Sequence, residues 1–200
     1  PMKAIYPMVG ASAAACAQNL KSSSFTGTFS SGWTFASTGV TPNGTSAYFD
    51  TTLIPNTSLT LTSGHMSFYS RTNNNTGIYD MGTGDGSVQQ NLITRYSDDK
   101  FYACYGNPGQ VLSIANTSSL GFFVTNTNSY KKGTQVATGV QTSLLAVQSI
   151  YISAFHSGGA SAYSNRQCAL SSIGDGLDAT QASNFYTAVQ AFQTTLSRQV

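Results

Sequence analysis

The chain has 200 residues and a formal net charge of +2, and only 8% of its residues are charged, against about 25% in an average soluble protein. No apolar run approaches the ~20 residues of a membrane-spanning helix. The small net charge offers no basic patch for nucleic acid. We therefore expect neither membrane insertion nor a nucleic-acid partner. Aromatic residues make up 12% of the chain and occur in alternating runs, which predicts a folded core rather than disorder.

The first residues, 1–24, are expected to form a lead-in segment to a single domain that spans 1–200. The stretch 2–16 superficially resembles a signal peptide, with one Lys, a short apolar run and small residues before a Cys. Pro7 interrupts that run, so an edge strand at 4–9 is the better interpretation. We expect the chain to be part of a longer polypeptide.

The middle of the chain is a succession of short extended runs separated by turn signals. The run 65–71 alternates in the way that is typical of a strand. Residues 73–77 and 82–86 are rich in Asn, Gly and Asp and predict loops, and 130–133 predicts a hairpin turn with Gly in the left-handed conformation. Spacings of about 8–12 residues favour an all-β fold with two antiparallel sheets. The predicted strands are 32–35, 45–50, 58–62, 65–71, 78–81, 90–96, 100–105, 110–115, 120–125 and 134–138.

The last quarter of the chain predicts two more strands and a helix. Residues 149–156 alternate strictly, and 164–173 is a second strand candidate. Asp178 and Gln181 have the spacing of a helix-capping pair, which starts a helix at 178–197. We expect this helix to lie on one sheet or at one edge, although its apolar stripe also allows a seam between subunits. The stripe consists of Ala182, Phe185, Val189, Phe192 and Leu196.

Three separated runs, 33–51, 61–73 and 163–196, resemble the concanavalin A-like lectin/glucanase (laminin G-like) domains carried by tail, fibre or other virion proteins of bacteriophages. The opening residues 2–10 are similar to the lead-in of such domains in longer phage proteins. The resemblance implies a jelly-roll sandwich displayed on the surface of a virion and often tied to glycan recognition. Because one fold supports many functions, it constrains the biochemical role less than the fold.

Catalysis is not expected. The resembled glucanases carry a Glu-x-Asp-x-Glu motif, whereas all seven acidic residues here are Asp. Retaining hydrolysis needs two carboxyl groups about 5–5.5 Å apart, and Asp98 and Asp99 are adjacent, so they would point to opposite faces of a strand. His65 and His156 lie in strand patterns, and no G-x-S-x-G motif accompanies the serines. We expect no enzymatic activity and no cofactor.

A metal site is also not expected. Asp80 and Asp85 in the glycine-rich stretch 80–86 are candidate calcium ligands, but they lack EF-hand spacing and a tight turn explains them better. The sequence contains no Cys-x-x-Cys pair of the kind that binds zinc. Cys104 and Cys168 lie in strand patterns, where Cys is usually a small buried hydrophobic residue. Whether either pairs with the other or with Cys16 stays open.

Sugar binding requires an aromatic side chain that can stack on a sugar, with polar groups beside it. Ordinary sandwich packing explains aromatic residues in strands equally well. We expect one group of candidate residues near one rim of the sandwich and Trp33 as a separate aromatic platform. The candidate glycan-binding residues are Trp33, Tyr69, Arg71, Tyr79, Asp80 and Arg95.

Two non-enzymatic functions stay open, with a carbohydrate-active enzyme as a distant third. One is a virion-surface host-attachment domain that recognises cell-surface glycans. The other is a purely architectural decoration or assembly domain without a ligand. In both cases the expected partners are other virion subunits, including further copies of the chain in a homo-oligomer.

Overall fold

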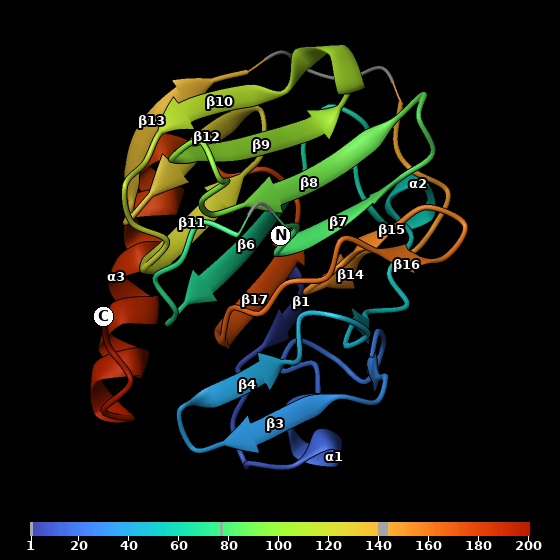
Figure 1. Ribbon diagram of the computed structural model, residues 1–200. Helices are drawn as coiled ribbons and strands as arrows, with labels where there is room; N and C mark the ends of the chain where they lie inside the picture. The colour runs from blue at the N-terminus through green and yellow to red at the C-terminus, as the bar shows by residue number, and fades with distance from the viewer. Residues whose placement is uncertain (1, 77, 140–143) are drawn as a thin grey trace.

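The computed structural model describes residues 2–76, 78–139 and 144–200 and contains two sheets packed face to face (Figure 1). Sheet A has the order β13 (Thr134–Thr138), β12 (Asn128–Lys131), β11 (Gly121–Thr125), β6 (His65–Ser70), β17 (Cys168–Gly174), β4 (Gly39–Pro42) and β3 (Trp33–Ala36), and β1 (Met2–Tyr6) also pairs with β17. Sheet B has the order β10 (Leu112–Ala115), β9 (Lys100–Gly106), β8 (Gln89–Ile93), β7 (Met81–Gly84), β14 (Tyr151–Ile152), β5 (Phe49–Asp50) and β2 (Thr28–Phe29). At its margin β15 (Phe155–His156) pairs with β7 and with β16 (Ala160–Ser161). The predicted antiparallel two-sheet sandwich is confirmed.

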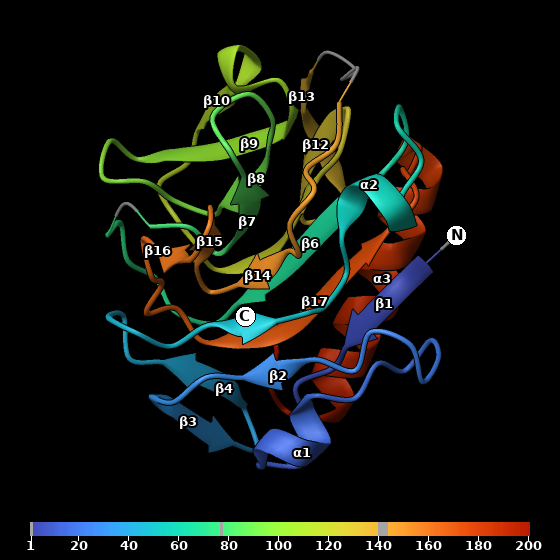
Figure 2. The same ribbon diagram turned by 90° about the vertical axis from the view of Figure 1, so that its right-hand side faces the viewer.

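One long helix, α3 (Ala179–Thr195), lies against sheet A on the side away from sheet B (Figure 2). Its predicted start is confirmed, because Asp178 accepts from the backbone of Gln181 and the side chain of Gln181 accepts from the backbone of Asp178. Three further short helices are α1 (Ala13–Cys16), α2 (Pro55–Ser58) and the 3-10 turn η1 (Pro108–Gln110). None of the described helices is long and apolar enough to cross a membrane.

The sandwich has two apolar layers, which explains why β6 is buried at every position. Met66 and Phe68 point between the sheets, where they meet residues of sheet B such as Leu92 and Phe101. On the opposite face of sheet A, Tyr69 belongs to a second cluster. The apolar stripe of α3 packs into this second cluster through Ala182, Phe185, Val189 and Phe192, so the helix covers its own sheet.

Several predicted local structures differ from those observed. The predicted strand 78–81 is a bend with an isolated bridge between Tyr79 and Tyr163, and β7 begins only at Met81. The predicted strand 149–156 is interrupted between β14 and β15. The predicted strand 58–62 is instead the end of α2 and an isolated bridge between Thr60 and Ser63, because Pro55 starts a helix. The predicted loop 82–86 is largely strand β7, whose Gly82 and Gly84 pair with β8. By contrast, the turn after β12 is as predicted.

Candidate functional site

Two of the six glycan candidates from the sequence hold the C-terminal segment in place instead. Tyr69 is fully buried beneath α3, and its hydroxyl donates to Gln190 Oε1 at 2.8 Å and accepts from the backbone of Val200 at 3.0 Å. Arg71 donates from Nε to the carbonyl of Arg198 at 2.7 Å. The ring of Tyr69 is therefore not available to a sugar.

Asp80 forms a buried ion pair with Arg166 and is therefore not available to a sugar or a calcium ion. It is fully buried, and both of its oxygens lie 3.0 Å from Nη1 of the equally buried Arg166. They also accept from the backbone and hydroxyl of Thr94 at 2.7 and 2.8 Å and from Ser164 Oγ at 2.9 Å. With these partners, its carboxylate stabilises the junction between β7, β8 and the segment before β17.

The second calcium candidate, Asp85, closes a turn, as the sequence favoured. Its Oδ1 accepts from the hydroxyl and backbone of Ser87 at 2.7 and 3.0 Å and from the backbone of Val88 at 3.2 Å. These hydrogen bonds lower the pKa of the Asp85 carboxyl, and the bond from the Ser87 hydroxyl has the largest effect. Over the described residues, no group of three or more His, Cys, Asp or Glu side chains lies close enough to hold a metal ion.

Trp33 and Arg95 lie in different parts of the molecule. Trp33 is a half-buried residue of edge strand β3, where its Nε1 donates to the carbonyl of Tyr48 at 3.2 Å (Figure 1). Arg95 follows β8, and its Nη2 lies 2.7 Å from Oδ1 of Asp99. Of the five candidates expected near one rim, Tyr69 and Arg71 contact the C-terminal segment and Asp80 is fully buried, so the five do not form one surface site.

A hollow of about 310 Å³ lies on the outer face of sheet B. Its strand residues alternate as a two-sided sheet requires: Asn91 and Ile93 of β8 point outward, whereas Leu92 between them belongs to the core. Tyr102 of β9 is the direct cross-strand partner of Ile93 and shares that outer face. The lining residues are Tyr79, Gln89, Asn91, Ile93, Tyr96, Tyr102 and Val111.

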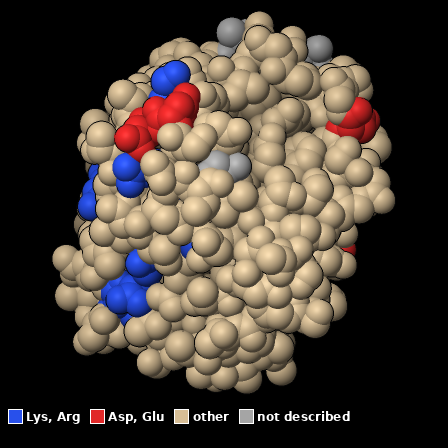
Figure 3. Space-filling view, viewed as in Figure 1, with Lys and Arg blue, Asp and Glu red and all other residues tan. Residues whose placement is uncertain are grey.

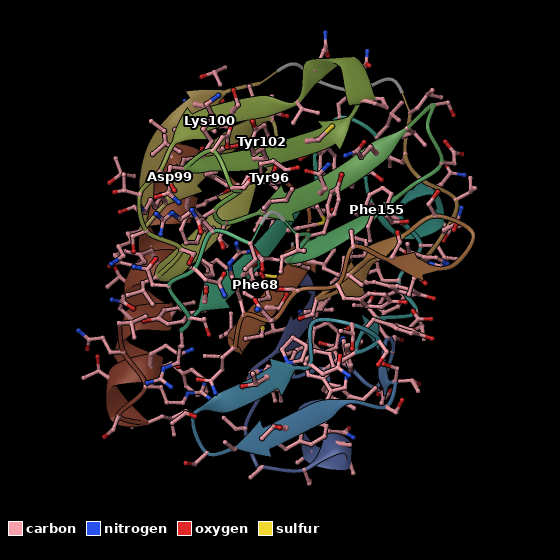
Figure 4. All side chains as sticks on the ribbon, in the orientation of Figure 1. Phe68, Tyr96, Asp99, Lys100, Tyr102 and Phe155 are labelled. Atoms are coloured by element: carbon pink, nitrogen blue, oxygen red, sulfur yellow. The ribbon has the colours of Figure 1, made fainter. Side chains whose placement is uncertain are left out.

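Two tyrosines form a fixed corner of this hollow (Figure 4). The rings of Tyr96 and Tyr102 meet edge to face, with centroids 5.4 Å apart. The hydroxyl of Tyr102 donates to Asp98 Oδ2 at 2.8 Å, and this hydrogen bond raises the pKa of Tyr102, so the phenol stays neutral. Tyr96 is 38% exposed, which leaves aromatic surface open to solvent.

Asn91, which lines the hollow, carries an unpaired polar atom in its side chain. Asn91 is 1% exposed, and its Oδ1 has no hydrogen-bond partner among the described residues. A buried acceptor without a partner costs about 1–3 kcal/mol, so its persistence needs a reason. Because Asn91 lines the hollow, a ligand that donates a hydrogen bond there would satisfy it.

The charges beside the hollow are paired with one another. Lys100 Nζ lies 3.1 Å from Asp98 Oδ2, and Arg95 is paired with Asp99. Figure 3 shows Lys, Arg and Asp side chains grouped at one side of this face, next to a broad uncharged surface. None of the described residues that line the hollow is charged.

Of the sequence candidates, Tyr79 lines the hollow, while Arg95 belongs to the charged group beside it. The ring of Tyr79 contacts that of Phe155 at 4.6 Å, and burial raises the pKa of its hydroxyl. Sequence reasoning identified the strands that carry Asn91 and Tyr102 but not these residues. The signal was the pair of alternating runs 90–96 and 100–105, which place polar and aromatic side chains on one face.

Comparisons with known proteins identify the fold alone. No family model matches the chain, and no curated protein matches it. One similar structure is domain 4 of a GH43 extracellular arabinanase from Geobacillus stearothermophilus, solved in complex with arabinotriose. The match covers 92% of this chain and 98% of that domain, with a TM-score of 0.61 and 11% sequence identity. A mutant Trypanosoma rangeli sialidase with trans-sialidase activity matches 85% of this chain over 30% of its own, with a TM-score of 0.53 and 11% identity. The chain thus shares its β-sandwich fold with domains of glycan-processing proteins.

Proposed function

We propose that this domain binds a neutral glycan, without cleaving it, in the hollow on the outer face of sheet B. The observation that carries the proposal is the unpaired Oδ1 of Asn91 in the lining of an uncharged, tyrosine-lined hollow. Sugar hydroxyls donate to such an acceptor, and the apolar face of a sugar ring stacks on the rings of Tyr96 and Tyr102.

The charges argue for a neutral ligand and against hydrolysis. An anionic sugar requires an available cation, but Arg95 and Lys100 already have carboxylate partners. Hydrolysis requires two carboxyl groups that flank the bond to be cleaved. Asp98, the acid bonded to Tyr102, is also paired with Lys100, and none of the described lining residues contributes a carboxyl group.

The biological setting that we propose is the surface of a virion, where the domain attaches to host glycans. The three sequence runs that resemble phage tail and fibre domains support this setting. The arabinotriose complex of the arabinanase domain supports a carbohydrate as ligand class, although 11% identity carries no sugar specificity.

The test is binding of the domain to an array of neutral and acidic glycans that includes arabino-oligosaccharides. We expect binding to neutral members, and loss of that binding in Tyr102→Ala. Tyr186→Ala is the matched control, because Tyr186 is a half-buried tyrosine of α3 on the opposite side of the sandwich. Absence of binding to every glycan, or equal loss in both variants, would overturn the proposal.

An architectural role is a second candidate, favoured by an apolar groove between α3 and β1. The groove measures about 170 Å³ and includes Pro7, Leu170 and Phe192, and at its edge Leu20 is 65% exposed. In this alternative a second copy of the domain covers the groove. Light scattering across protein concentration tests it: a dimer that Leu20→Ser dissociates would support it, whereas a monomer at all concentrations would reject it.

A further inference from the structure

The outer face of sheet B carries a straight row of side-chain positions that crosses the strands. Tyr151 of β14 pairs with Gly82 of β7, Gly82 pairs with Asn91 of β8, and Asn91 pairs with Cys104 of β9. Direct partners on neighbouring strands share one face and lie about 5 Å apart. The sheet face that carries the hollow therefore continues toward Tyr151.

Phe155 lies over this row at Gly82 and Gly84, the two positions of β7 that have no side chain. A Cβ at Gly82 would come within 2.6 Å of Phe155 Cδ2, and one at Gly84 within 3.1 Å of its Cζ. The two glycines thus let the ring rest directly on the sheet. Phe155 stays half-exposed and contacts Tyr79 of the hollow at 4.6 Å.

The aromatic surface continues beyond Phe155. Tyr151 stacks on His156 with ring centroids 3.9 Å apart, and on its other side on Tyr48 at 4.5 Å. Tyr48 and His156 are both half-buried, so this stack borders the solvent-facing side of sheet B. Figure 4 shows Phe155 well to one side of Tyr96 and Tyr102 on the same face.

We propose that the ligand is an extended glycan chain that crosses the strands from the tyrosine corner to Phe155, so that the site recognises several consecutive sugar units. This inference rests on the proposed glycan-binding function. Tyr102 belongs to β9 and the ring of Phe155 lies over β7, two strands apart, which is about 10 Å. One sugar ring does not span that separation, whereas a short oligosaccharide does.

A second platform makes affinity depend on chain length. Isothermal titration with the arabino-, gluco- and manno-oligosaccharide series, from about two to about six units, measures this dependence. For the series that the array identifies, we expect affinity to rise about 3- to 10-fold between the disaccharide and the longer members, as one added aromatic contact provides. Phe155→Ala should lose this gain with chain length, whereas Phe155→Tyr should retain it.

The outcomes separate this inference from the function on which it rests. Equal affinity for the disaccharide and the hexasaccharide, or a full length gain in Phe155→Ala, would overturn the extended site and leave glycan binding intact. Loss of all binding in Phe155→Ala, with an unchanged circular dichroism spectrum, would also overturn it, because Phe155 would then belong to a single compact subsite. Failure of every glycan to bind would overturn both.

Discussion

Removing Arg166 while leaving Asp80 in place should destabilise the domain more than any other change to a charged residue that we propose. The Arg166→Met variant keeps the length of the side chain but leaves the Asp80 carboxylate fully buried without its cation. The hydrogen bonds from Thr94 and Ser164 remain and offset part of the cost.

The magnitude follows from burial. Breaking a buried ion pair by removing one partner costs about 3–5 kcal/mol, because the remaining charge stays uncompensated. At about 2–4 °C per kcal/mol for a domain of this size, the melting temperature should fall by about 6–20 °C. Arg166 Nη2 also donates to the carbonyl of Asn74, and the variant loses this hydrogen bond as well.

Urea denaturation followed by circular dichroism measures the change in unfolding free energy. The control is Asp99→Asn, which breaks the more exposed pair with Arg95 and should cost no more than about 1 kcal/mol. The double variant Asp80→Asn with Arg166→Met should cost less than the sum of its single changes, because it leaves no unpaired charge. If Arg166→Met costs no more than Asp99→Asn, the reasoning from burial is refuted.

Three further predictions concern single side chains. Burial lowers the pKa of His65 to about 4, so the unfolded chain binds this proton more tightly than the folded protein does. The free energy of unfolding should therefore be highest above about pH 6.5 and should fall by about 3 kcal/mol as the pH is lowered to about 4. Thermal melts across this pH range measure the effect. Asp178→Ala removes the capping bond to Gln181 and should cost about 1 kcal/mol in urea denaturation, whereas Asp178→Asn should cost less. Burial raises the pKa of the Cys104 thiol to about 11, and Cys168 is more deeply buried. Both thiols should therefore react with a maleimide near neutral pH only after unfolding, which intact-mass measurement detects, and rapid labelling of the native protein would contradict this.

The fold was predictable where the signal is local. The alternation of 65–71 and the capping pair at Asp178 specify their elements without reference to the rest of the chain. The prediction of a loop at 82–86 was wrong because glycines usually mark turns in a local sequence pattern. Here Phe155, far along the chain, packs over Gly82 and Gly84, and a strand with glycine at these two positions leaves room for its ring.

The site was less predictable because it depends on which face of each sheet is covered. Tyr69 and Tyr102 both occur in alternating strands, and their sequence environments are alike. Tyr69 lies beneath α3, whereas none of the described helices covers the sheet face that carries Tyr102 (Figure 2). Whether a tyrosine belongs to the core or to a binding surface is therefore decided by the docking of α3, which no local pattern encodes.

Asp80 and Asn91 differ in whether their buried side-chain oxygens have hydrogen-bond partners. Both are almost fully buried, but every oxygen of Asp80 has partners, whereas Oδ1 of Asn91 has none. Replacing Asn91 removes an unpaired acceptor, so Asn91→Val should raise the free energy of unfolding by about 1 kcal/mol while abolishing glycan binding. Urea denaturation and titration on the same protein test the two effects together. A variant that is destabilised by more than about 1 kcal/mol would mean that the amide has a structural role, and the strongest reason for placing a ligand in the hollow would be lost.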